Sequence, residues 1–197
     1  MTKHMSWLLG ALMFVGAACS LAQAQPSQQH SQEHAAAAPQ TPDQKSQAGA
    51  LLQIVRDATE RFKDVSAAEA AGYVLTFGCV SGPDSGAMGL HFVNFSLVAS
   101  GVLDPRNPQI VIYEPTADGH LRLIGADFLV IQSQWDATHQ DPPQLMGQLF
   151  HLFDSPNRFK LPAFYTLHVW AWKENPNGAF VNWHPNVSCQ AFSGQTP

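Results

Sequence analysis

One short segment, Leu-His-Val-Trp-Ala-Trp at residues 167–172, constrains the fold of this chain more than any other. Successive side chains of a strand point to opposite faces, so His168, Trp170 and Trp172 are expected on one face of a sheet. Both faces carry bulky or apolar groups, which predicts a strand that is covered on both sides. A histidine buried among indoles needs a hydrogen-bond partner or a metal ion. His168 is therefore the first candidate for a functional site.

The rest of the pattern predicts an α+β fold. Apolar residues at helical spacing indicate an amphipathic helix over about residues 47–64, and a capping box at residues 66–69 indicates a short second helix. Strand-like segments follow at about residues 73–80, 91–98, 109–114, 120–133, 164–173 and 179–183. A further short helix is expected to begin at residues 141–144. Helices followed by hairpin-linked strands favour a mainly antiparallel sheet, and the pattern leaves open whether that sheet curls into a barrel.

The first 24 residues have the pattern of an export signal. A short apolar run at residues 7–18 is too short to span a bilayer, and Ala22-Gln23-Ala24 fits a cleavage site after Ala24. The alternative is a lipoprotein anchored through Cys19, although its lipobox would have Gly16 where Leu or Val is usual. The protein is accordingly expected to be periplasmic or secreted.

Composition divides the remainder into a linker and one domain. Residues 25–46 are rich in Gln, Ala and Pro and predict a disordered linker. Residues 47–197 are expected to form a single α+β domain. The formal net charge is −5 and no basic patch is present, so nucleic acid is not an expected partner. No second hydrophobic span follows the signal, so the mature form is expected to have no membrane span.

Cysteine usage predicts a disulfide. Cleavage of the signal would remove Cys19 and leave Cys79 and Cys189. An even number of cysteines in an oxidising compartment favours a bond between them. The bond would close a loop of about 110 residues and contribute roughly 4–5 kcal/mol in the chain-entropy model. Two free buried thiols are the alternative.

Four ionisable side chains occur within the apolar strand segments: His91, Glu114, Asp127 and His168. Two histidines and one carboxylate are a common ligand set for zinc, iron, copper or manganese. We expect His91, Asp127 and His168 to hold one divalent transition-metal ion, with Glu114 as the reserve ligand. An open coordination position would permit metal-assisted chemistry, but the sequence names no reaction.

The predicted hairpin at Asp118-Gly119 separates the two carboxylates. A two-residue loop places Leu123 opposite Glu114. The same register places Asp127 opposite Ile110. The carboxylates then share a face but lie about 13 Å apart at ~3.3 Å per residue, too far to bind one ion. Asp127 is preferred because it lies in mid-strand and should be buried, whereas Glu114 ends its strand where solvation is easy.

Aromatic residues are predicted to line a pocket around this site: Trp170, Trp172, Tyr113 and Tyr165. In the alternative interpretation the protein is a metal-free binding module for a small apolar or aromatic molecule, and a structural core without a site is a third. A metal centre requires the two imidazoles and the carboxylate within about 4–5 Å of each other. A binding module requires an apolar cavity of roughly 300 Å³ or more. His184 and His151 are expected at the surface.

Several segments together resemble a family of exported bacterial proteins: GCVSGP at 78–83, GAMGLHFVN at 86–94, YEP at 113–115, and LHVWAW at 167–172 through NVSC at 186–189. The likeness spans roughly residues 64–189 and implies an export route, but no particular activity. The family often has Glu where this chain has Asp127, which keeps a carboxylate. It often has Trp-Asn-Pro where this chain has Trp183-His184-Pro185, so the resemblance gives His184 no shared role.

Overall fold

The computed structural model describes residues 40–194, so the predicted signal and most of the predicted linker lie outside the described residues. Helical segments come first: α1 (Pro42–Thr59), the 3₁₀-helix η1 (Glu60–Lys63) and α2 (Val65–Ala70). The strands and two short helices follow: β1 (Val74–Ser81), β2 (Ala87–Val93), α3 (Phe95–Ser100), β3 (Ile110–Pro115), β4 (Leu121–Ile131), α4 (Gln132–Asp136), β5 (Gln144–Leu145), β6 (Gln148–Leu149), β7 (His151–Phe153) and β8 (Phe164–Val169). This order confirms the predicted α+β class.

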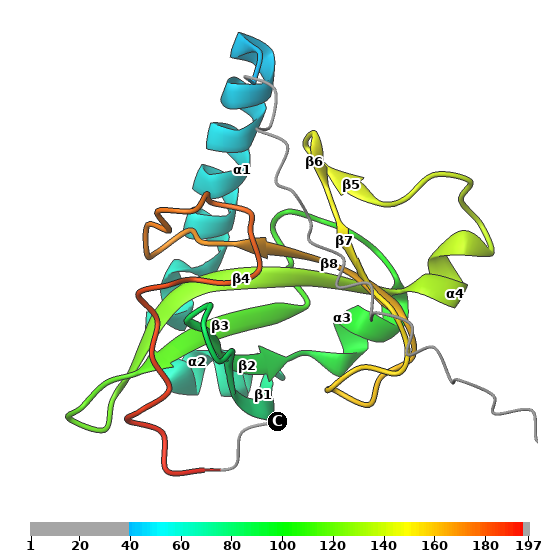
Figure 1. Cartoon of the computed structure of the whole chain (residues 1–197). Coiled ribbons are helices and arrows are strands. Elements are labelled where there is room, and N and C mark those ends of the chain that lie inside the picture. Colours follow the sequence, from blue (N-terminus) through cyan, green and yellow to red (C-terminus); the bar gives the residue numbers. More distant parts are fainter. Residues whose placement is uncertain (1–39, 195–197) are drawn as a thin grey trace, which may run out of the picture. The chain divides into compact units, whose positions relative to one another are not determined.

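Six strands form one antiparallel sheet in the order β1-β2-β3-β4-β8-β7, which curls into a half-barrel (Figure 1). Leu51 and Val55 of α1 pack on one face of the sheet, against residues of β4 and β8. Phe62 of η1 and Ala68 of α2 pack against β2 and β3. A separate apolar cluster, which includes Phe164, lies on the other face. The strand at β8 is therefore covered on both sides, as its sequence predicts.

The two first helices begin differently from the prediction. Thr41 caps α1 by accepting a hydrogen bond from the backbone N–H of Gln44 at 3.2 Å, and the Gln44 side chain accepts from the Thr41 N–H at 2.9 Å. This capping box starts α1 inside the predicted linker, five residues or so before the apolar pattern begins. Asp64, rather than Ser66, caps α2, since its carboxylate accepts from the Ser66 N–H at 3.0 Å.

The hairpin between β3 and β4 has a longer loop than predicted. Backbone bonds at 2.9 Å join the Thr116 N–H to the His120 carbonyl and the Gly119 N–H to the Thr116 carbonyl. Gly119 has a φ of +82°, which glycine adopts without strain. This three-residue loop shifts the register by one residue, so Glu114 faces Arg122 instead of the predicted residue.

A bulge in β4 then restores the predicted register. Ile112 pairs with Gly125 and Tyr113 with Leu123, so Ile124 is the extra residue between them. Beyond the bulge Ile110 pairs with Asp127, as expected. The two deviations cancel where the candidate site begins.

Three other segments differ from the predicted elements. The segment at 91–98 is divided, because the Asn94 side chain accepts hydrogen bonds from the N–H groups of residues 96 and 97 and starts α3. No helix begins at 141–144; Met146 and Gly147 have positive φ values of 48° and 77° and turn β5 into β6. Residues 179–183 form no strand, and only an isolated bridge joins Ala87 to His184.

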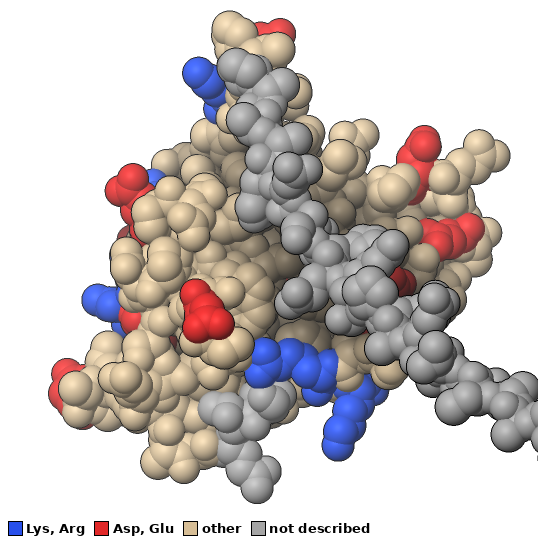
Figure 2. Space-filling view, viewed as in Figure 1, with Lys and Arg blue, Asp and Glu red and all other residues tan. Residues whose placement is uncertain are grey.

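Cys79 and Cys189 form a disulfide, which confirms the predicted pair. The bond links β1 to the C-terminal segment across 110 residues of sequence. Among residues 40–194, no helix is both long and apolar enough to cross a membrane. Figure 2 shows acidic and basic side chains scattered among uncharged residues on one face of the molecule.

Candidate metal centre

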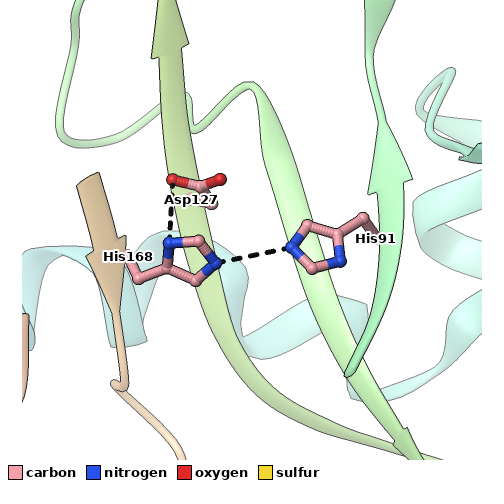
Figure 3. Close-up of side chains that lie close together, drawn as sticks. All are labelled: His91, Asp127 and His168. Atoms are coloured by element: carbon pink, nitrogen blue, oxygen red, sulfur yellow. Dashed lines mark hydrogen bonds and ion pairs between the residues drawn. The ribbon is translucent and has the colours of Figure 1, made fainter. Parts of the chain in front are cut away.

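The three predicted ligands His91, Asp127 and His168 lie together on the face of the sheet that carries Phe164 (Figure 3). One potential ligand atom from each residue lies within 4.8 Å of the others, inside the 4–5 Å that a metal site requires. The residues are 4%, 3% and 2% exposed, respectively. The sequence-based prediction that these side chains converge agrees with this geometry.

Curvature of the sheet brings the histidines together. Asp127 and His168 are direct cross-strand partners on β4 and β8. His91 lies on β2, three strand intervals from β8. In a flat sheet that separation would be about 14 Å at ~4.8 Å per interval. The curl of the sheet and the reach of the two imidazole side chains together bring the Nε2 atoms to 3.4 Å from each other.

The backbone fixes the proton of His91. Its Nδ1 lies 3.1 Å from the Gly89 carbonyl oxygen, which can only accept, so Nδ1 carries the hydrogen. In the neutral ring, Nε2 then presents a lone pair toward His168. Gly89 has a φ of +91°, and a Cβ there would lie 2.6 Å from the Tyr113 carbonyl oxygen. This glycine is therefore needed to aim the carbonyl at His91.

His168 stands between the other two residues. Its Nε2 faces His91, and its Nδ1 lies 3.6 Å from Asp127 Oδ1. That Nδ1 is buried and has no hydrogen-bond partner among residues 40–194. Asp127 Oδ1 is held by the Thr166 hydroxyl, which donates to it at 2.5 Å.

Burial shifts the pKa of all three groups away from the charged form. Burial, and then the neighbouring His168, lowers the pKa of His91 to about 4. Burial lowers the pKa of His168 to about 3. Burial raises the pKa of Asp127 to about 6, against the opposing effects of His91 and Thr166. Both imidazoles are therefore neutral at pH 7, and burial opposes the ionisation of Asp127.

A small apolar pocket borders the triad. Its walls include four phenylalanines from three strands and a loop, Phe77, Phe153, Phe159 and Phe164, together with aliphatic side chains. The cavity has a volume of about 20 Å³. A buried water needs about 10–15 Å³, so the cavity has room for about one water molecule.

None of the four aromatic residues expected to line the pocket lies on its wall. Trp170 packs beside His168, with ring centroids 5.9 Å apart, and its indole N–H donates to a backbone carbonyl. Tyr113 and Tyr165 pack in the clusters on the helix-covered face, where the Tyr113 hydroxyl donates to the Phe62 carbonyl at 2.6 Å.

Trp172 packs on the helix-covered face of the sheet rather than beside His168. Strand β8 ends at Val169, and the Ala171 N–H then bonds back to the Val169 carbonyl at 2.8 Å. That turn breaks the alternation on which the prediction depended. Trp172 packs with the helix-face clusters and donates from its indole to Thr59 Oγ1 at 2.9 Å. Trp170 and Trp172 both border a separate surface hollow of about 400 Å³.

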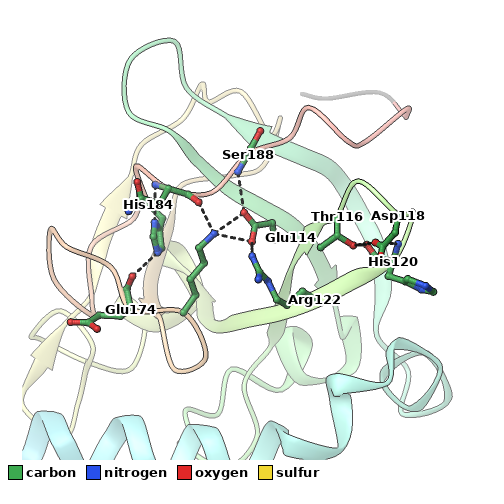
Figure 4. Close-up of polar contacts among 10 residues, drawn as sticks. Glu114, Thr116, Asp118, His120, Arg122, Glu174, His184 and Ser188 are labelled. Atoms are coloured by element: carbon green, nitrogen blue, oxygen red, sulfur yellow. Dashed lines mark hydrogen bonds and ion pairs between the residues drawn. The ribbon is translucent and has the colours of Figure 1, made fainter.

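Glu114, the reserve ligand, takes part in a network of ion pairs and hydrogen bonds instead of the triad (Figure 4). It is only 6% exposed, contrary to the prediction that it is solvated. Its carboxylate accepts hydrogen bonds from Arg122 and from Lys173, the latter at 2.7 and 2.8 Å. The Ser188 N–H donates to it at 3.3 Å. These partners neutralise Glu114 and hold its pKa below the usual range, although burial alone would raise it.

His184 is buried rather than at the surface. It is 0% exposed, and its Nε2 lies 3.0 Å from the Glu174 carbonyl oxygen. Its Nδ1 accepts from the Asn186 N–H at 3.1 Å. Both ring nitrogens are used within the C-terminal segment, which explains the burial. His151 is exposed, as predicted.

Sequence reasoning missed two polar residues beside the triad. Thr166 lies two residues before His168 on the same strand, so alternation alone would have placed it on the same face. Asn182 contacts His168, and this contact raises the pKa of His168 against the effect of burial. Its Oδ1 is buried and without a hydrogen-bond partner in the described part of the chain. No sequence pattern marks Asn182, because it lies in an irregular segment.

Comparison with protein-family models, with curated proteins and with solved structures gives no match to this chain.

Proposed function

We propose that this protein binds one divalent transition-metal ion between the imidazoles of His91 and His168. The observation that carries this proposal is the convergence of three buried ligand-type side chains from β2, β4 and β8. Buried polar groups of this kind are normally hydrogen-bonded, paired or bound to a metal. The disulfide between Cys79 and Cys189 supports a periplasmic or secreted location, where such bonds persist.

The spacing of the imidazoles suits a metal ion. Two nitrogen ligands at about 2.0–2.1 Å in tetrahedral geometry lie about 3.3–3.4 Å apart. The Nε2 atoms of His91 and His168 are separated by 3.4 Å. The Gly89 carbonyl already selects the tautomer of His91 that leaves Nε2 free to bind.

Charge also favours a cation at this place. Burial keeps both histidines neutral and raises the pKa of Asp127, so an ionised Asp127 has no balancing charge within the triad. A buried charge without a partner is costly. A divalent ion next to His168 would compensate it.

We assign Asp127 to the outer side of His168. Its Oδ1 faces Nδ1 of that ring rather than Nε2. When a metal takes Nε2, the ring proton resides on Nδ1 and a carboxylate typically accepts it. In this arrangement the Nδ1 proton would face Asp127 Oδ1, which lies 3.6 Å away, and coordination positions would stay open. It supports metal binding, and open positions permit metal-assisted chemistry.

The metal-free binding module receives less support. It requires a cavity of roughly 300 Å³ or more beside the histidines. The pocket there offers about 20 Å³, which is too little for an aromatic molecule.

Cobalt(II) titration tests the proposal, because cobalt replaces zinc-type metals and gives visible absorption that reports tetrahedral coordination. The expected result is a one-to-one endpoint in the native protein and no such binding in His91→Ala or His168→Ala. His120→Ala is the matched control, since His120 is exposed at the hairpin before β4 and is not part of the triad. Equal cobalt binding in all four proteins would overturn the proposal.

A further inference from the structure

One aromatic side chain on the wall of the pocket beside the triad contacts residues at both edges of the sheet. Phe159 lies in the segment between β7 and β8. Its ring centroid is 5.2 Å from Phe77 on β1 and 6.1 Å from Phe153 on β7. Strands β1 and β7 are the two edges of the six-stranded sheet. Phe159 thus forms a bridge across the open side of the half-barrel.

The segment that carries Phe159 is held in place by its own hydrogen bonds. The Asn157 carboxamide donates to the carbonyls of Asp154 and Leu161, both at 3.0 Å. Its oxygen accepts from the N–H groups of Phe159 and Leu161. Arg158 also donates to the Ser81 carbonyl at 2.9 Å, which ties the segment to β1. The aromatic wall is therefore a built feature of the fold.

The wall selects by polarity as well as by size. The polar groups on the pocket wall come from the triad and Thr166, and every other lining side chain is apolar. Anions and strongly hydrated molecules that enter this space lose most of their water and meet only the triad and Thr166 as replacement partners. Cavities lined by Leu, Ile and Phe take up neutral gases such as xenon, and eight of the twelve side chains that line this pocket are apolar.

We infer that this pocket delivers a neutral diatomic molecule, of the class of dioxygen, nitric oxide or carbon monoxide, to the open side of the bound ion. The inference rests on the proposed metal site and adds its ligand class. His91 and His168 both line the pocket, so a molecule in it lies beside the side chains that would hold the ion. The free space of about 20 Å³ admits a molecule of that size and excludes aromatic rings.

A first experiment tests the pocket without any metal. Xenon is added to the metal-free, disulfide-bonded protein, and methyl NMR signals are followed. The expected shifts occur at Ile110 and Leu129, which line the pocket, and not at Leu51 or Val55 under α1. Absence of shifts at the pocket methyls would overturn the inference even if the metal site exists.

A second experiment tests delivery to the ion. The protein is loaded anaerobically with iron(II), its iron content is measured, and nitric oxide or azide is added. The expected result is an iron–nitrosyl absorption and electron paramagnetic resonance signal with nitric oxide, and no spectral change with azide. Iron-loaded protein that binds azide but not nitric oxide would contradict the inference. Protein that retains no iron would instead count against the metal site, and the xenon result would still decide the pocket.

A filled pocket provides the matched variant. Leu129→Phe places a larger side chain in the space and is expected to lower the affinity for nitric oxide at least about tenfold with unchanged iron content. Leu129→Met keeps the volume and should bind as the native protein does. Unchanged nitric oxide affinity in a folded, iron-loaded Leu129→Phe protein would contradict the inference.

Discussion

The Nε2 atoms of His91 and His168 lie 3.4 Å apart, although 77 residues separate them in sequence. This distance results from three strand pairings and the curl of the sheet between β2 and β8. The lone pair of one ring faces the other, and the Nδ1 atoms point to a backbone carbonyl and to Asp127. The predictions below follow from this relationship and from the charges around it.

The first prediction concerns the effect of the Asp127 charge on metal affinity. Asp127→Asn should weaken metal affinity about 10–100-fold, the usual effect of losing a carboxylate that orients a ligating histidine. Competition with a chromophoric chelator measures this change. Asp84→Asn, at an exposed position, is the control. Loss of all binding, as in His168→Ala, would instead identify Asp127 as a direct ligand.

The same substitution should stabilise the metal-free protein at pH 7. The pKa of Asp127 is raised from 3.8 to about 6, so stability falls as the pH rises between these values, and the full cost is present at pH 7. The neutral Asn avoids this cost, and its oxygen can still accept from Thr166. The expected gain is about 1–3 kcal/mol in the free energy of unfolding, measured with urea and a chelator present. A destabilised variant would show that the carboxylate contributes to the fold.

The histidines make the stability of the metal-free protein depend on pH. The pKa values of His91 and His168 fall to about 4 and about 3, so the unfolded chain binds their protons first as the pH drops. Stability therefore falls from about pH 6.5 to pH 4, partly offset by protonation of Asp127 in the folded state. Urea unfolding at several pH values checks this slope. His120→Ala should keep this pH dependence of stability. If the dependence disappears in that variant, groups other than His91 and His168 cause it.

Glu114 should matter for stability but not for metal binding. Glu114→Gln leaves Lys173 and Arg122 without their shared carboxylate. Because both cations are partly exposed and can be solvated, the expected loss is about 1–2 kcal/mol. Thermal unfolding and metal analysis of the same sample test both parts. Loss of metal with intact stability would return Glu114 to the ligand set.

The disulfide should account for a large share of stability. Replacing both cysteines, Cys79→Ser with Cys189→Ser, opens a loop of 110 residues. The chain-entropy model predicts a loss of about 4–5 kcal/mol. Comparison of the variant with the native protein in oxidising buffer measures it. A loss below about 1 kcal/mol would mean that the C-terminal segment is held mainly by its other contacts.

The sequence predicted the elements and ligands that depend on local pattern. Alternation in β4 and β8 marked Asp127 and His168 as inward-facing, and the hairpin register placed Asp127 opposite Ile110. That register is right only because the bulge at Ile124 compensates for the longer loop at Gly119. Two local deviations from ideal geometry cancelled, which a pattern of single residues does not reveal.

The parts that sequence did not predict depend on tertiary structure. The convergence of His91 with His168 requires the curl of the sheet, which alternation does not encode. Burial of His184 and Glu114 depends on the C-terminal segment folding back to them. Trp172 left the predicted face because β8 ends at Val169. At residues 141–150 the apolar spacing indicated a helix, but the chain turns at Met146-Gly147. Met146 has a positive φ there, which a residue with a side chain rarely adopts and which the sequence does not announce.

Elemental analysis of the protein, purified without a His-tag or chelator, tests the central claim most directly. We predict close to one transition-metal ion per chain in the native protein, and none in His91→Ala or His168→Ala variants whose circular dichroism is unchanged. Native protein that remains metal-free after incubation with zinc, copper, iron and manganese would contradict the account.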